Sequence, residues 1–280
     1  MNYCESLQWF TQKYNSIVCM GLDPVIEDIP FFKDSIQKTI YSFYEDILNK
    51  CIASHIFPSC VKPNYAFYAQ YGMEGILALI DIIKLFHTEG FPVILDVKRG
   101  DIGKTAQAYA RESFEFFGAD AVTLSPYLGY DSIKPFTQYY PDKGCYILVK
   151  TSNKSSAEIQ DLPVNGEPLY VLVAKKILEW HSAGLGAVVG ATFPKQLKDI
   201  INIFVQSGKD IPVLIPGIGS QGGDVDALLD IIKKSKHAYL YRINASSSIN
   251  YAYKNTEYNN VQYAVAAVEA LKKLNDTFGH

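Results

Sequence analysis

Short apolar runs alternate with longer amphipathic segments along almost the whole chain. The short runs have the length and composition of buried strands and cover residues 17–22, 57–62, 92–97, 121–124, 145–149, 187–190, 212–215 and 238–241. The segments between them carry apolar residues three and four positions apart, which places those residues on one face of a helix. Two such stripes are Ile76, Leu79, Ile80, Ile83 and Phe86, and Val261, Ala264, Val265, Val268 and Leu271. We interpret both stripes as faces that pack on a core.

Strands that alternate with helices predict parallel pairing through right-handed crossovers. Eight strand–helix units in roughly 250 residues favour a (β/α)8 TIM barrel, and a doubly wound open sheet is the alternative. The chain shows no Pro/Gly/Ser-rich linker, low-complexity segment or internal repeat. We therefore expect one α/β domain over residues 1–280, with a C-terminal helix at about 256–275.

The composition of the chain argues against several classes of protein. The 280 residues are 48% apolar with a net charge of -3 and no block of Lys or Arg, which argues against a nucleic-acid partner. The five cysteines form no C-x-x-C pair, which favours free thiols in a reducing compartment. The start of the chain lacks a signal-peptide pattern, and no run approaches the roughly 18 apolar residues of a membrane helix. These features predict a cytoplasmic protein without a membrane partner.

A barrel places its functional residues where the strands end and the βα-loops begin. Polar residues follow the predicted strands at those points, namely Asp23, Lys62, Asp96 with Lys98, Ser152, the turn 216–223 and Arg242. Acids, lysines, hydroxyls and an arginine are therefore expected on one rim.

The stretch 95–105 carries the strongest chemical signal. Side chains two apart in a strand point to the same face, so Asp96 and Lys98 project together, and Asp101 begins the next turn. A bare D-x-K pair is compatible with a surface ion pair. Two carboxylates that flank a lysine at the end of a buried strand instead favour catalysis. Burying unpaired charge is energetically unfavourable, so such a cluster is usually retained for its chemistry.

The glycine-rich turn at 217–223 precedes a predicted helix and indicates a phosphate site. Glycines let backbone N–H groups approach an anion, and an arginine fork such as that of Arg242 binds phosphate bidentately. The alternative is an ordinary turn beside a surface arginine. The connection from Thr151 to about Glu167 is long for a βα-loop, so it is interpreted either as a lid or as a disordered insertion.

Together these motifs resemble the orotidine 5'-phosphate decarboxylase family, in the branch with the signature K-R-G-D-I-G-x-T-A. The resemblance rests on residues 96–106, 61–64, 150–153 and 216–222 and on Arg242, and it spans Gly21 to about Arg242. Two positions depart from the family pattern. Tyr241 stands where a glycine is common, and Ser220 stands where an alanine is common.

The resemblance implies a role for each matching residue. The expected catalytic tetrad consists of Lys62, Asp96, Lys98 and Asp101. In a homodimer, Asp101, Ile102 and Thr105 would reach into the partner's site. Asp23 would bind a ribose hydroxyl and Ser152 the pyrimidine, while Gln221 and Arg242 would bind the phosphate, and Pro216, Gly219 and Ser220 would complete the substrate site.

The implied reaction converts orotidine 5'-phosphate to uridine 5'-phosphate and CO2 in de novo pyrimidine synthesis. No binding motif for a cofactor or metal is visible, so catalysis is expected to depend on preorganised charge, with Lys98 supplying the proton that replaces CO2. One alternative is a magnesium-dependent 3-keto-gulonate 6-phosphate decarboxylase, a relative that places a glutamate ligand where Lys62 stands here. A second alternative is a non-catalytic phosphate-binding barrel.

Overall fold

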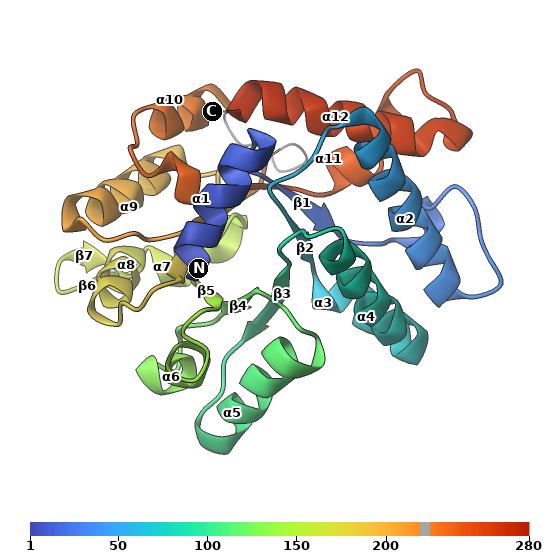
Figure 1. The fold of residues 1–280 in the computed structure, drawn as a ribbon. Helices are drawn as coiled ribbons and strands as arrows, with labels where there is room; N and C mark the ends of the chain where they lie inside the picture. The colour runs from blue at the N-terminus through green and yellow to red at the C-terminus, as the bar shows by residue number, and fades with distance from the viewer. Residues whose placement is uncertain (219–224, 280) are drawn as a thin grey trace.

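A computed structural model describes residues 1–218 and 225–279, in which eight parallel strands form a barrel surrounded by helices (Figure 1). The barrel strands are β1 (Val18–Leu22), β2 (Cys60–Pro63), β3 (Ile94–Arg99), β4 (Ala121–Leu124), β5 (Gly144–Lys150), β8 (Leu185–Val189), β9 (Val213–Pro216) and β10 (Tyr241–Ala245). Most of their residues are buried, because a barrel strand has side chains on its inner face and helices on its outer face.

The strand order shows a barrel rather than an open doubly wound sheet. The hydrogen-bonded order is β2-β1-β10-β9-β8-β5-β4-β3, and parallel bridges Val61↔Val93 and Asn64↔Asp96 bring β2 beside β3. This nearly closed arrangement confirms the predicted (β/α)8 fold and a single domain.

The helices cover the outside of the barrel in chain order (Figure 1). The α-helices are α1 (Tyr3–Tyr14), α2 (Ile36–Ser54), α3 (Tyr65–Ala69), α4 (Gly72–Thr88), α5 (Gly103–Arg111), α6 (Tyr130–Gln138), α7 (Ala157–Gln160), α8 (Leu169–Glu179), α9 (Pro194–Ser207), α10 (Val225–Lys233), α11 (Ser247–Asn250) and α12 (Tyr263–Phe278). Leu79, Ile83 and Phe86 of α4 are buried, as their spacing predicted. None of the helices in the described ranges is long and apolar enough to span a membrane.

Two predicted boundaries near the C-terminus are wrong. The predicted strand at 238–241 is a single 3-10 turn, η4 (Ala238–Leu240), and the strand follows it as β10. The last helix begins at Tyr263 rather than near residue 256, and Val261 is 88% exposed instead of facing the core. Asn259 accounts for the later start, because its side chain caps the short 3-10 helix η6 (Asn260–Gln262).

The long connection after β5 has structure of its own. It contains η3 (Lys154–Ser156), helix α7 and a two-stranded hairpin formed by β6 (Pro163–Val164) and β7 (Glu167–Pro168). Asn165 and Gly166 form the hairpin turn with positive φ angles of 53° and 85°, the conformation that a tight two-residue turn requires. The interpretation of this connection as a disordered insertion is therefore wrong.

Candidate active site

A cavity of about 420 Å³ opens among the carboxyl ends of the barrel strands. Polar groups from the strand ends and following loops supply much of its wall: Asp23, Lys62, Asn64, Asp96, Lys98, Thr123, Thr151, Ser152, Asn244, Ser246 and Ser247. Leu148, Val188 and Leu214 add an apolar surface. A small ligand with one flat face and several polar groups suits such a wall.

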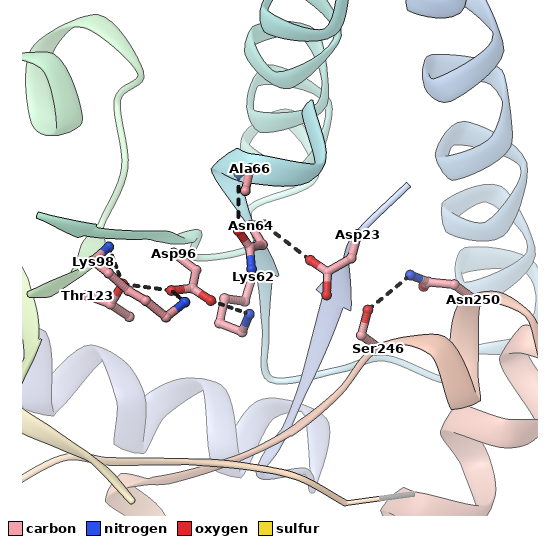
Figure 2. Close-up of polar contacts among 9 residues, drawn as sticks. All are labelled: Asp23, Lys62, Asn64, Ala66, Asp96, Lys98, Thr123, Ser246 and Asn250. Carbon is pink, nitrogen blue, oxygen red and sulfur yellow. Dashed lines mark hydrogen bonds and ion pairs between the residues drawn. The ribbon is translucent and has the colours of Figure 1, made fainter. Parts of the chain in front are cut away.

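Asp96 is the centre of the charged network. Its Oδ2 accepts a hydrogen bond from Lys62 Nζ at 3.2 Å, and its Oδ1 accepts from Lys98 Nζ at 2.6 Å and from Thr123 Oγ1 at 2.7 Å. Figure 2 shows the carboxylate lying between the two ammonium groups. The pairing satisfies a carboxylate that is almost fully buried and would otherwise be strongly unfavourable.

Burial and charge act in opposite directions on this pair. Burial alone would raise the pKa of Asp96, but the charges of Lys62 and Lys98 outweigh it and hold that pKa well below its ordinary value. Burial would likewise lower the pKa of Lys62, but Asp96 and Asp23 outweigh it and raise that pKa. Asp96 and Lys62 are therefore both ionised at neutral pH.

Lys98 is held in a strained conformation that directs it into the cavity. Its φ of 47° lies in the left-handed region, which non-glycine residues seldom adopt outside sites where the structure enforces it. The β3–β4 register shifts between Leu95 and Arg99, and Lys98 N donates to Thr123 Oγ1 at 2.9 Å. The Lys98 side chain stays 48% exposed, whereas that of Lys62 is 5% exposed.

The neighbouring part of the wall is built on Asp23, which follows β1 beside Lys62 of β2. Asp23 Oδ1 accepts from Asn64 N at 3.2 Å, which ties the ends of β1 and β2 together (Figure 2). Gly21 lets the chain after β10 approach closely, because a Cβ at Gly21 would lie 2.6 Å from the Cβ of Ser246. Ser246 is thereby held at the edge of the cavity.

The structure brings together many of the predicted site residues. Those that line the cavity are Asp23, Lys62, Asp96, Lys98, Ser152 and Pro216. Asp101, Ile102 and Thr105 follow β3 but are not part of the cavity wall of this chain. Gly219, Ser220 and Gln221 lie outside the described residues.

The prediction that Arg242 lies on the phosphate rim is wrong. Arg242 is the second residue of β10 and is fully buried. Its NH2 group donates to Leu7 O at 2.6 Å, and its NH1 group donates to Tyr241 O at 2.7 Å, Tyr239 O at 3.1 Å and Thr11 Oγ1 at 3.2 Å. These partners belong to α1, to η4 and to the first residue of β10, at the barrel end opposite the cavity.

Sequence reasoning missed several cavity residues with hydrogen-bonding side chains: Asp28, Tyr251, Thr123, Asn244, Ser246 and Ser247. The last three were missed because the eighth strand was placed too early. With β10 at its true position, the polar run 244–248 falls at the strand end. Thr123 lies in an apolar strand, and only its partners identify it.

Comparison with known proteins agrees with this geometry. Residues 16–275 match the family described as "Orotidine 5'-phosphate decarboxylase / HUMPS family". The chain belongs to this family. An orotidine 5'-phosphate decarboxylase of Cupriavidus necator is 40% identical over 261 residues, with 92% of each chain covered. Its counterpart from Roseiflexus castenholzii is 39% identical over 279 residues, with 99% of this chain and 97% of the relative covered.

A solved structure shares both fold and length. The Leishmania donovani OMP decarboxylase superposes with a TM-score of 0.78 at 30% identity, with 99% of each chain covered. Family membership, barrel architecture and the position of the cavity therefore agree.

Proposed function

We propose that this protein is an orotidine 5'-phosphate decarboxylase, a carboxy-lyase of pyrimidine synthesis that forms uridine 5'-phosphate and CO2. The observation that carries the proposal is the Lys62–Asp96–Lys98 network at the cavity wall. The family match and relatives of that name at about 40% identity support the same reaction. Non-catalytic phosphate binding would not require a strained, half-exposed lysine beside a buried acid.

The network suits the chemistry of this decarboxylation. When the bond between C6 and the carboxylate breaks, its electron pair stays on C6 and CO2 leaves. The ammonium of Lys98 stabilises that developing charge and then transfers a proton to C6, so that the nucleotide product forms. Asp96 holds Lys98 in place, and Lys62 is the buried countercharge of Asp96.

The roles of other cavity residues are carried over from the family resemblance, and their place in the cavity wall supports them. Asp23 would bind a ribose hydroxyl, and Ser152 would contact the pyrimidine. For the phosphate, Gln221 remains a proposal from the sequence, and Arg242 is replaced by the hydroxyls of Ser246 and Ser247. Among the described wall residues the only cations are Lys62 and Lys98, so we propose that neutral donors bind the phosphate.

Two properties of the protein complete the proposal. We infer a homodimer in which Asp101, Ile102 and Thr105 enter the partner's cavity, because they adjoin the network without lining the cavity of their own chain. A cytoplasmic location is supported by five free cysteines, all of them buried.

The magnesium-dependent gulonate reaction is not favoured. An ammonium stands at the end of β2, where that reaction places a metal-binding glutamate, and Lys62 contacts Asp96 directly. Activity toward orotidine 5'-phosphate is therefore expected to be unchanged by EDTA. Loss of activity in EDTA with recovery in Mg²⁺ would support the gulonate alternative.

The direct test is Lys98→Ala in a spectrophotometric assay with orotidine 5'-phosphate. Loss of the proton donor alone costs about 100- to 10,000-fold in kcat, and loss of its charge adds to that. Lys84→Ala is a control, because Lys84 is an exposed lysine of α4 that does not line the cavity. More than a tenth of the wild-type activity in Lys98→Ala would refute the assignment.

A further inference from the structure

The loop that follows β5 is linked to the barrel by a partly buried ion pair. Lys150 is the last residue of β5, and its side chain is fully buried. Its ammonium donates to Asp161 Oδ1 at 2.7 Å and lies 4.6 Å from the ring centre of Phe193. A buried ammonium is strongly unfavourable without a partner, so Lys150 depends on the carboxylate that the loop brings to it.

A second contact lies directly beside the first. Gln160 Oε1 accepts from Thr151 N at 2.9 Å, and Gln160 Nε2 donates to Thr151 Oγ1 at 2.8 Å. Two consecutive residues at the strand end thus bind two consecutive residues of the loop. We call Lys150, Thr151, Gln160 and Asp161 the loop clip, and it closes residues 152–159 into a compact unit.

The loop clip is next to the cavity wall. Thr151 and Ser152 both line the cavity. On its other side, Ser152 O accepts from Thr192 Oγ1 at 3.1 Å, and a Cβ on Gly190 would come within 2.8 Å of Ser152 Cα. Ser152 is therefore held between the end of β8 and the loop clip.

We propose that Asp161 is a positioning residue that sets Ser152 in the cavity wall by neutralising buried Lys150. Asp161 is not part of the cavity wall, so it acts through Lys150 and the strand end. The proposal rests on the proposed function only for the identity of the ligand that Ser152 meets. It implies that the loop is tied at its base, so that any motion over the cavity takes place within residues 152–159.

The test compares Asp161→Asn with Asp161→Glu and with Glu158→Gln, a control at an exposed acid of the same loop. Lys154 offers a trypsin site inside the loop. Asp161→Asn should raise the cleavage rate after Lys154 about tenfold, because the loop opens locally more often. It should also lower kcat/KM for orotidine 5'-phosphate by about 10- to 100-fold, since small misplacements of substrate contacts have effects of this size.

Three further results decide between positioning and general damage. Asp161→Glu should recover part of both losses, and Glu158→Gln should match the wild type in both. The double variant Lys150→Met/Asp161→Asn should resist trypsin better than Asp161→Asn, because no unpaired buried charge remains. Faster cleavage with unchanged kcat/KM would make Asp161 structural and overturn the proposal, as would unchanged cleavage.

Failure of the proposed function would be seen separately. If the wild-type protein did not turn over orotidine 5'-phosphate, the proposed decarboxylase function would be refuted. Amide hydrogen exchange at Thr151 and Ser152 needs no substrate and would still decide whether Asp161 orders the cavity wall. Equal exchange in the wild type and in Asp161→Asn would overturn the positioning role.

Discussion

The two lysines that contact Asp96 have different surroundings and therefore different uses. Lys62 is almost fully buried and serves as the fixed countercharge that lets Asp96 stay ionised inside the barrel. Lys98 is half exposed and faces the space where a ligand would lie. A proton donor must reach its substrate, so the exposed lysine is the one suited to transfer. The sequence spacing alone does not distinguish these roles.

Thr123 orients this network, and its substitution should affect turnover more than binding. Its hydroxyl accepts from Lys98 N and donates to Asp96 Oδ1. Thr123→Val keeps the shape but leaves both groups without that partner, at about 1–3 kcal/mol. If that free energy is lost in the transition state, kcat falls about 5- to 150-fold at about 1.4 kcal/mol per tenfold. Steady-state kinetics of Thr123→Val should show a nearly constant KM. The control Thr123→Ser should retain most of the wild-type kcat. A wild-type kcat in Thr123→Val would contradict the proposed role of Thr123.

The lowered pKa of Asp96 makes stability depend on acid pH. A carboxyl whose folded pKa is depressed contributes its full stability above its unfolded pKa, about 3.9, and loses it as pH falls toward the folded value. The melting temperature of the wild type should therefore drop below about pH 4 more steeply than that of Asp96→Asn. The difference between the two proteins should be largest near neutral pH and should shrink in acid.

A surface acid provides the control for this titration. Asp34 also has a lowered pKa, caused by Lys38, but both side chains are largely exposed to solvent. Solvent screens such pairs, so Asp34→Asn should leave the melting curve close to that of the wild type at every pH. Parallel acid transitions of the wild type and Asp96→Asn would show that Asp96 is not the group responsible.

At the scale of elements, β10 joins the N-terminal helix to the barrel. Helix α1 lies across one end of the barrel (Figure 1), and Arg242 donates to Leu7 O and Thr11 Oγ1 of that helix. Tyr3 of α1 adds a contact with Tyr146 of β5, with the two hydroxyl oxygens 3.0 Å apart. Arg242 thus links the first helix to the last strand. Its guanidinium donates hydrogen bonds to carbonyl oxygens and to the Thr11 hydroxyl.

Arg242→Ala should therefore damage the fold rather than phosphate recognition. It leaves several buried acceptors without a donor, which should lower the free energy of unfolding by about 3 kcal/mol or more. For the molecules that stay folded, the ratio of kcat/KM for orotidine 5'-phosphate to kcat/KM for orotidine should match the wild type. Urea unfolding and the two assays measure both quantities. A loss of kcat/KM confined to the phosphorylated substrate would instead indicate that Arg242 binds the phosphate.

How far the sequence predicts each element depends on what stabilises it. The barrel strands β1 to β5, β8 and β9 are recognisable because burial on both faces demands continuous apolar runs, and Asp96 and Lys98 interrupt such a run visibly. β10 was misplaced because a buried arginine is rare in a strand, and only the carbonyl groups of α1 explain it. The loop clip was also invisible, since the pairing of Lys150 with Asp161 depends on how the intervening loop turns back.

At the scale of the whole molecule, the charged residue Asp101 lies near the cavity but does not line it. Asp101 lies two residues after the end of β3, and the adjoining Ile102 is 56% exposed. The next βα-loop lies beside it, since Ser125 N donates to Arg99 O, and it carries Tyr127 at 87% exposure and Leu128 at 47%. Exposed apolar side chains gathered around an acid at the mouth of a site are typical of a protein–protein contact.

A shared site can be tested by mixing two inactive proteins. Lys98→Ala and Asp101→Ala should each be inactive alone, because each removes one charged member of the expected tetrad. In a heterodimer of the two, one site would combine the intact Lys98 of one chain with the intact Asp101 of the other. Random refolding of an equal mixture should then restore about a quarter of the wild-type sites, because half of the dimers are mixed and each has one intact site.

The control is an equal mixture refolded with Lys98→Ala and the double variant Lys98→Ala/Asp101→Ala, which can form no intact site. Native mass spectrometry establishes that mixed dimers are present in both samples. Recovery in the first mixture alone would show that Asp101 acts across the interface. If mixed dimers formed and the first mixture stayed as inactive as the control, Asp101 would act within its own chain. The apolar residues around it would then need another explanation.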